Sequence, residues 1–289
     1  MDIIVNGVLL GLGYCLITSG IALILGVAKI FDLVYSGYYL ITAYLLFLLF
    51  YSKLSLPLWL IFLIGVGVAI ILALLNHKFL ILPIRKKPTA VMVLTIAICM
   101  IIQELLIIVG GPEAIHVPAV LKGTSSLFGV LVTKQKLLVG GVTIGLIGLL
   151  WLFFSRTRLG LAIRATAEQP EAMQLAGGNI RRMCLWAAIL SAILAAIGAL
   201  LIGPIYPPHP YAWLDLLIIA FAVMVLGGLG NLWGCVPAAL ILGVSEVAFA
   251  VYVPYGGIIK RSVGLIIIFM VLVFRPIGLF GTKGWEEEE

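Results

Sequence analysis

Long runs of apolar residues, almost free of charge, constrain this chain more than any other feature. A helix of about 20 apolar residues crosses the hydrocarbon of a bilayer. The runs do not alternate apolar and polar residues with period two, which excludes a transmembrane β-barrel. Nine runs can be marked: 5–28, 36–51, 57–82, 91–110, 137–154, 185–203, 214–229, 236–253 and 263–280. They predict an all-α, polytopic membrane protein with about 8–10 transmembrane helices, some of them discontinuous or re-entrant.

The composition leaves little besides membrane-embedded helices. Of the 289 residues, 63% are hydrophobic and 10% are charged, whereas soluble domains are about a quarter charged. This excludes a soluble domain, a disordered chain, a disulfide scaffold and a nucleic-acid-binding protein. We therefore expect residues 1–289 to form a single transmembrane domain. Met1–Asn6 has neither a basic stretch nor a small-residue cleavage site, so the first run is interpreted as a retained span.

Basic residues predict the orientation in the membrane, because loops rich in Lys and Arg tend to stay in the cytoplasm. Arg85–Lys87 marks one such loop, and the arginines within 156–182 mark a second. Alternating outward from these loops places the N-terminus outside and the C-terminus inside, with Lys283 and the tail Glu286–Glu289 in the cytoplasm. The lysines within 122–136 then lie in an external loop of about 25 residues, where positive charge is less decisive.

The chain carries no motif of an enzyme. It lacks a Gly-x-x-x-x-Gly-Lys-Ser/Thr phosphate loop, a His-Glu-x-x-His metal motif and a Gly-x-Ser-x-Gly elbow. Cys15, Cys99, Cys184 and Cys235 stand singly among apolar residues without metal-ligand spacing, so we expect buried free thiols. We expect a transport protein that is not an enzyme and binds no cofactor or metal.

Four acidic residues fall within the apolar runs or at their ends: Asp32, Glu104, Asp215 and Glu246. Ionisable residues are costly in hydrocarbon and mark a pathway or a pair. Asp32, Glu104 and Asp215 are also compatible with span ends that touch water or headgroups. Glu246 lies deepest, and either a hydrogen bond to a neighbouring helix or transport chemistry explains it. No two acids are placed as a proton relay, which argues against a proton-driven carrier.

Small residues four positions apart occur in several runs, as at Gly7 and Gly11, Gly141 and Gly145, and Gly230 and Gly234. Such residues let helix backbones approach closely in lipid. The spacing alone does not distinguish contacts between subunits from contacts within one subunit.

The polar loop 155–182 contains two short amphipathic pieces that join at Gln169 and Pro170. Proline suits the first turn of a helix, and Glu171 behind it complements the positive helix end. Gly177 and the residues that follow it end the second piece. A short helix held outside the bilayer could bind a soluble partner, and the alternative is an interfacial helix that rests on lipid headgroups.

This loop resembles the coupling loop of ABC importer permeases, most closely that of the branched-chain amino acid permeases. The resemblance extends to the opening 6–11, to the glycine-rich segment 226–231 with 240–246, and to the ending 275–281. Gly178 stands where the family has Ile. The residues that the resemblance assigns to ATPase coupling are Gly160, Arg164, Ala165, Ala167, Glu168, Pro170, Glu171, Ala172, Leu175, Gly177 and Asn179.

The resemblance implies a permease subunit of an ATP-driven importer of amino acids, foremost branched-chain amino acids, in a prokaryotic plasma (inner) membrane, surrounded by the lipid bilayer and without nucleic acid. Its implied partners are a second permease subunit, commonly a different but related chain, two ATP-binding subunits that hold ATP and Mg, and an extracytoplasmic substrate-binding protein. ATP hydrolysis is expected on the partner subunits. The alternative function is an ATP-independent secondary transporter or channel, which needs no rigid cytoplasmic helix.

The expected translocation path combines the break after the first span with the glycine-rich segment and one acid: Asp32, Tyr35, Ser36, Gly227, Gly228, Gly230 and Glu246. The family often has Asn-Phe-Ala-His-Gly where this chain has 32–36, so our hypothesis is a solute other than a branched-chain amino acid. Candidates are another amino acid, an amide such as urea, or a small carboxylate or cation. Glycines 227–230 could form a broken helix that faces the path or a plain turn. The stretch 203–210 could meet the binding protein or cap the helices.

Overall fold

The computed structural model of the protein describes residues 1–51, 57–85, 87–127, 129–253, 256–275 and 278–279. Each predicted apolar run overlaps a helix, which confirms the all-α architecture. The helices are α1 (Asp2–Ala28), α2 (Tyr35–Phe50), α3 (Leu58–Leu75), the π-helix η1 (Asn76–Ile81), α4 (Leu82–Ile84), α5 (Pro88–Gly110), α6 (Lys134–Arg156), α7 (Arg158–Glu168), α8 (Pro170–Leu175), α9 (Ile180–Ile202), α10 (Ala212–Gly227), α11 (Leu232–Tyr252) and α12 (Gly256–Phe274). Lys86, Lys283, the tail Glu286–Glu289 and most of the matched ending 275–281 lie outside the described residues.

Six helical segments of the described chain are long and apolar enough to cross a membrane. They are α1, the continuous α3–η1–α4, α5, α6, α9 and α11. The shorter apolar segments are α2, α10 and the last part of α12. The polytopic prediction is therefore confirmed, with α2 and α10 as the short members.

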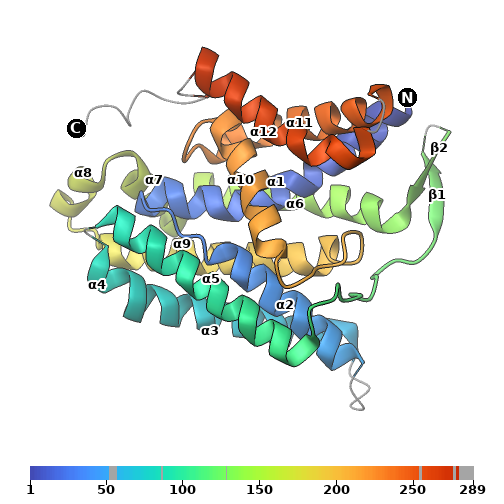
Figure 1. Ribbon diagram of the computed structural model, residues 1–289. Coiled ribbons are helices and arrows are strands. Elements are labelled where there is room, and N and C mark those ends of the chain that lie inside the picture. Colours follow the sequence, from blue (N-terminus) through green and yellow to red (C-terminus); the bar gives the residue numbers. More distant parts are fainter. Residues whose placement is uncertain (52–56, 86, 128, 254–255, 276–277, 280–289) are drawn as a thin grey trace.

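The long helices run back and forth between two ends of the bundle (Figure 1). One end carries the N-terminus and a β-hairpin of β1 (Thr124–Leu127) and β2 (Val130–Thr133), paired antiparallel with Thr124 opposite Thr133. The other end carries α7 and α8. The hairpin lies where the sequence predicts an external loop of about 25 residues. We call these the hairpin end and the α8 end.

Helix α1 lies at the centre of the bundle and packs against α6, α9, α10 and α11. Its contact with α11 depends on glycine, because a Cβ on Gly243 would lie 2.6 Å from the carbonyl oxygen of Gly7 and 2.5 Å from the Cα of Gly11. Gly7 and Gly11 therefore serve a contact within the subunit, whereas a Cβ on Gly141 or Gly145 would meet nothing within 4 Å. Helix α7 packs on both α1 and α9 at the α8 end.

Two features interrupt the regular helices. Residues 29–34 separate α1 from α2, and Lys29 ends α1 in a left-handed conformation with φ 52°. The π-helix Asn76–Ile81 interrupts the long helix formed by α3 and α4, and such segments recur at functional sites. The four cysteines are free and buried, as predicted.

Candidate transport cavity and coupling surface

The coupling loop forms the two short helices that the sequence predicts. Helix α7 ends at Glu168 and α8 begins at Pro170, so the predicted junction is confirmed. The hydroxyl oxygen of Thr157 caps α7 by accepting a hydrogen bond from the Gly160 amide at 2.9 Å. A Cβ on Gly160 would lie 2.8 Å from the Cα of Phe154 in α6, so this glycine allows α7 to fold directly back on α6.

Helix α8 ends in a double hydrogen bond typical of a glycine-terminated helix. The Gly178 amide donates to the Met173 carbonyl at 2.8 Å and the Gly177 amide donates to the Gln174 carbonyl at 2.9 Å. Gly177 has φ 81°, a conformation that glycine adopts at little cost. A Cβ on Gly178 would lie 2.8 Å from the Met173 carbonyl oxygen. The isoleucine that the resemblance gives at this position would therefore require Met173 to shift.

Helix α8 presents an apolar side chain away from the protein. Leu175 is 91% exposed, and Glu171 and Ala172 are exposed beside it. Beyond the C-terminal end of α8, Asn179 accepts a hydrogen bond from the Arg182 amide at 3.2 Å and so caps α9. Leu175 is therefore exposed on a short helix that is held to α9 at its C-terminal end, as the predicted coupling role requires.

The remaining predicted coupling residues surround this surface. Arg164 and Glu168 form an exposed ion pair at 2.8 Å, with little effect expected on stability. Ala165 is also exposed, whereas Ala167 and Pro170 are half-buried and Gly160 is buried. The structure therefore brings the predicted residues together at one end of the bundle, and it places Gly160 in a supporting position.

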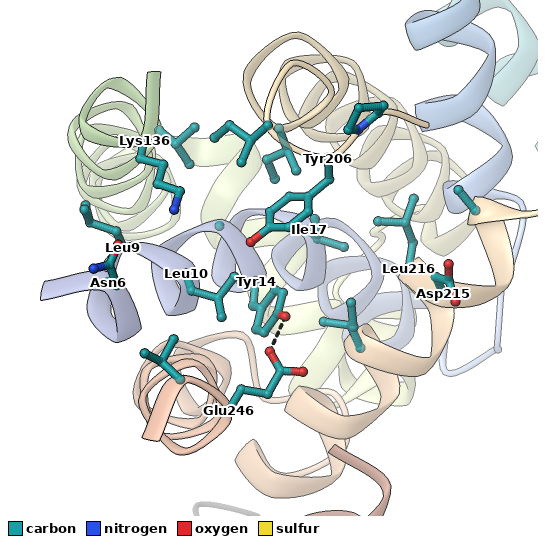
Figure 2. Close-up of a pocket in the computed structure, with 18 of the residues that line it drawn as sticks. Asn6, Leu9, Leu10, Tyr14, Ile17, Lys136, Tyr206, Asp215, Leu216 and Glu246 are labelled. Carbon is teal, nitrogen blue, oxygen red and sulfur yellow. Dashed lines mark hydrogen bonds between the residues drawn. The ribbon is translucent and has the colours of Figure 1, made fainter. Parts of the chain in front are cut away.

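A cavity of about 520 Å³ lies inside the bundle and begins at the hairpin end. Its walls come from α1, α6, α10 and α11 and from the connection between α9 and α10 (Figure 2). It reaches from Asp2 to Ile17 on α1, which is about 22 Å along the helix axis at 1.5 Å per residue. Sites for small molecules measure about 300–1,000 Å³, so the volume suits a small solute.

A buried carboxylate lies in the wall of this cavity. Glu246 of α11 is 4% exposed and accepts a hydrogen bond from the hydroxyl of Tyr14 on α1. The predicted alternative of a hydrogen bond to a neighbouring helix is thus what the structure shows, and the same side chain lines the cavity. Burial, together with the charge of Glu246, raises the pKa of the Tyr206 phenol in the α9–α10 connection.

Other charged residues lie around the cavity. Asp215, in the first turn of α10, lies with its Oδ2 3.4 Å from Nε2 of His209. It stands at a helix end and also lines the cavity, so the structure does not separate the two predicted alternatives. Lys136 projects into the cavity from α6 (Figure 2). The stretch 203–210 is tied to the connection between α5 and β1, because the Ile115 amide donates to the Pro208 carbonyl at 2.9 Å, and it also supplies cavity wall.

The predicted path residues 32–36 lie elsewhere. Asp32 is 2% exposed, so the alternative of contact with water or headgroups is wrong. Its Oδ1 accepts a hydrogen bond from the Val34 amide at 3.1 Å, and the Ser36 hydroxyl donates to the Leu33 carbonyl at 2.9 Å. Tyr35 is buried against α1, where a Cβ on Gly20 would lie 2.8 Å from its Cζ. Its ring therefore lies one turn beyond Ile17, the innermost cavity residue on α1.

Residues 227–231, three of which are glycines, form a tight turn between α10 and α11. The Asn231 amide donates to the Gly228 carbonyl at 3.1 Å, and Gly228 and Gly230 have positive φ angles of 95° and 75°. The Asn231 side chain caps α11 by accepting from the Gly234 amide at 3.1 Å. Of the two predicted alternatives, the structure shows the plain turn, at the α8 end, and none of these glycines lines the described cavity.

Sequence reasoning missed most of the cavity, although it named Glu246. Tyr14, Tyr206 and Lys136 come from segments far apart in sequence, and only folding brings them together. The sequence offered one signal for this site: Tyr14 and Glu246 each place a polar side chain within an apolar run. Among the described residues, no group of His, Cys, Asp and Glu could hold a metal ion.

A bundle of apolar helices with an internal cavity toward one end and a helical contact surface at the other defines a polytopic membrane permease. The particular family follows from comparison: residues 3–275 match the family described as branched-chain amino acid transport system / permease component, and the chain belongs to it.

Several relatives are similar over nearly the whole chain. The high-affinity branched-chain amino acid transport system permease protein BraD of Pseudomonas aeruginosa is 29% identical, over 98% of this chain and 96% of its own length. The corresponding protein LivH of Salmonella typhimurium is 27% identical over the same shares of the two chains. The fructose import permease protein FrcC of Rhizobium meliloti is 36% identical over 36% of this chain and 31% of its own length. No solved structure matches.

Proposed function

We propose that the chain is the membrane-spanning permease subunit of an ATP-driven ABC importer of amino acids, in a prokaryotic inner membrane. ATP and Mg bind to two separate ATP-binding subunits that dock on α7 and α8. A second, related permease subunit completes the membrane part, and an extracytoplasmic binding protein delivers the solute.

The observation that carries this proposal is the rigid presentation of Leu175. Its side chain is 91% exposed on a helix whose C-terminal end is fixed by the Gly177 turn and by the Asn179 cap of α9. A helix that merely rests on headgroups needs no such fixed connection to the next transmembrane helix. Contact between α7 and the central helix α1 gives a docked subunit a direct mechanical connection to the core.

The proposed orientation places the α8 end in the cytoplasm. Basic residues gather there, among them Arg85, Lys87, Arg158, Arg181 and Arg182, whereas the hairpin end has Lys122, Lys134 and Lys136. This distribution follows the rule that basic loops stay inside. The N-terminus is then outside and the C-terminus is cytoplasmic.

The proposed path joins the cavity to the α8 end. The cavity holds Glu246, and Tyr35 lies directly beyond its inner end. Asp32, Ser36 and the turn with Gly227, Gly228 and Gly230 lie farther along the same direction. The structure is then a state accessible from outside, in which Tyr35 blocks the inner half. An amino acid is the favoured solute because relatives of nearly full length carry that name; the shorter match to a fructose permease keeps the solute a question for experiment.

The test is purification of the tagged chain from its native membrane, with its partners identified by mass spectrometry. Leu175→Arg should abolish recovery of ATP-binding subunits and ATP-driven uptake. Leu131→Arg is the matched control, because Leu131 is 78% exposed at the opposite end, and it should retain the ATP-binding subunits. Equal recovery with Leu175→Arg, or uptake in ATP-free vesicles, would contradict the proposal and favour a secondary transporter or channel.

A further inference from the structure

A lysine lies within the span that α3, η1 and α4 form together. Lys78 belongs to the π-helix η1 and is exposed, inside the apolar segment Leu58–Ile84. Its backbone lies roughly 9 Å from the end of that segment, at about 1.5 Å per residue. Because α4 lies at the same end of the bundle as α8 (Figure 1), Lys78 faces the leaflet on that side. A charged side chain within a span is costly, and it indicates a partner or a function.

The described part of the chain supplies no anion for this ammonium group. Within that part, no carboxylate lies within ion-pair distance of Nζ of Lys78. Its polar neighbours in η1, Asn76 and His77, are buried. Nζ lies 5.6 Å from the centroid of the Phe79 ring, close enough for a cation–π contact. An ammonium group has three donors, so the ring face leaves donors available for an anion from outside this chain.

An exposed apolar strip leads from this ammonium group toward the middle of the span. Gly67, Ile71, Leu75 and Phe79 follow one another at intervals of four residues, a spacing that places neighbours on the same face of a helix. Ile71, Leu75 and Phe79 are 55%, 47% and 63% exposed. A Cβ on Gly67 would meet nothing within 4 Å. No other described part of the chain therefore covers this strip, which is long enough for much of an acyl chain.

We propose that Lys78 binds the phosphate of an anionic phospholipid, whose acyl chain lies along the apolar strip. The occupant follows from charge complementarity. A headgroup with a net negative charge neutralises an ammonium group that has no carboxylate partner, whereas a zwitterionic headgroup brings a cation of its own. Basic side chains near the membrane surface attract anionic lipids, and phosphate oxygens form strong hydrogen bonds with ammonium groups. The site is separate from the cavity and from α8, and it goes beyond the proposed function.

The test is a titration of the full, delipidated chain in detergent with phosphatidylglycerol or phosphatidylcholine, followed by native mass spectrometry. The first phosphatidylglycerol should bind about fivefold more tightly than the first phosphatidylcholine, the factor expected for one cation near the membrane surface. Lys78→Gln should abolish this preference, and Lys78→Arg should retain it. Equal affinities of the wild type for the two lipids, or an unchanged preference in Lys78→Gln, would overturn the inference.

Lys87→Gln is the matched control, because it removes an exposed cation that lies beyond the end of the span. It should keep the preference for phosphatidylglycerol. A loss as large as that in Lys78→Gln would reveal a general attraction to the basic end of the bundle, which contradicts a specific site. Phosphatidylglycerol should also raise the unfolding temperature of the wild type and of Lys87→Gln more than that of Lys78→Gln. Equal unfolding temperatures without lipid would show that the substitutions leave the fold intact.

Two other occupants give distinct results. Glycerol phosphate, which carries the same anion without acyl chains, should not displace phosphatidylglycerol; displacement would indicate a site for soluble phosphates and overturn the inference. If a carboxylate of a second permease subunit pairs with Lys78 instead, Lys78→Gln would lower recovery of that subunit from the native membrane, and phosphatidylglycerol would have no effect. That result would also overturn the inference.

Discussion

The hydroxyl of Tyr14 on α1 donates a hydrogen bond to the carboxylate of Glu246 on α11, across 232 positions of the chain. The pair lies in the wall of the cavity, which Lys136, Tyr206 and Asp215 also line. It fixes the position of the carboxylate where helices from both halves of the chain meet around a space large enough for a solute.

Removal of the Tyr14 hydroxyl should destabilise the protein because the buried carboxylate of Glu246 loses a hydrogen-bond donor. We expect Tyr14→Phe to cost about 1–3 kcal/mol, the usual penalty for an unsatisfied buried polar group. Thermal unfolding of Tyr14→Phe, Glu246→Gln and the double variant measures the coupling, which should be about 0.5–3 kcal/mol. Tyr252→Phe is the control, since Tyr252 is exposed at the same end; additive effects of the two cavity substitutions would show that the pair is not energetically linked.

Substitution of Gly243 should separate α1 from α11. A Cβ at this position would overlap the backbone of α1, at 2.6 Å from the Gly7 carbonyl oxygen. Overpacking of this kind costs about 1–3 kcal/mol, so Gly243→Ala should lower the unfolding temperature. The matched substitution Gly67→Ala should leave stability nearly unchanged, because a Cβ there meets nothing within 4 Å. A Gly243→Ala protein as stable as the wild type would contradict this packing.

The conformation of Gly177 should be necessary for coupling. Its φ of 81° is unfavourable for residues with a Cβ by about 1–2 kcal/mol, and asparagine tolerates it best. We expect Gly177→Ala to reduce recovery of ATP-binding subunits and ATP-driven uptake, and Gly177→Asn to restore most of both. Equal losses in the two variants would indicate that position 177 needs a residue without a side chain, and that the positive φ angle is not the reason for glycine there.

The orientation can be measured with a membrane-impermeant maleimide. Lys122→Cys and Gln174→Cys place exposed thiols at the hairpin end and the α8 end, and the four native cysteines are buried, so background labelling should be low. In intact cells the cysteine at 122 should react and the cysteine at 174 should react only after permeabilisation. Labelling of position 122 from the cytoplasm alone would reverse the proposed topology.

Asp32 should stabilise the connection between α1 and α2. Its Oδ1 accepts a hydrogen bond from the Val34 amide two residues further on, and loss of such a hydrogen bond costs about 1 kcal/mol. We therefore expect Asp32→Asn, which keeps the acceptor, to unfold like the wild type and Asp32→Ala to be less stable. An altered ranking of transported solutes in Asp32→Asn would instead support the hypothesis that this carboxylate contributes to solute selection.

Much of this architecture could be predicted from local patterns. The apolar runs located the helices, and Pro170, Gly177 and Asn179 located the short helices of the coupling loop, because each of these residues has a strong local preference. The hairpin was missed because the apolar residues of its strands look like the start of the following helix. The site was harder to predict, since Tyr14, Lys136 and Glu246 have no local relationship and their meeting depends on how glycine-rich faces let α1 and α11 approach.

Helix α1 has consequences for energetics as well as for packing. It continues for 27 residues without a break, and one face contacts α7 while another carries Tyr14. A shift of α7 thus changes the position of a cavity side chain through a single stiff segment. Linkage between two such sites is reciprocal: if docking at α8 weakens solute binding by some factor, the solute must weaken docking by the same factor. Solute binding in the cavity would thereby change the affinity of α8 for a docked ATP-binding subunit at the other end of the bundle.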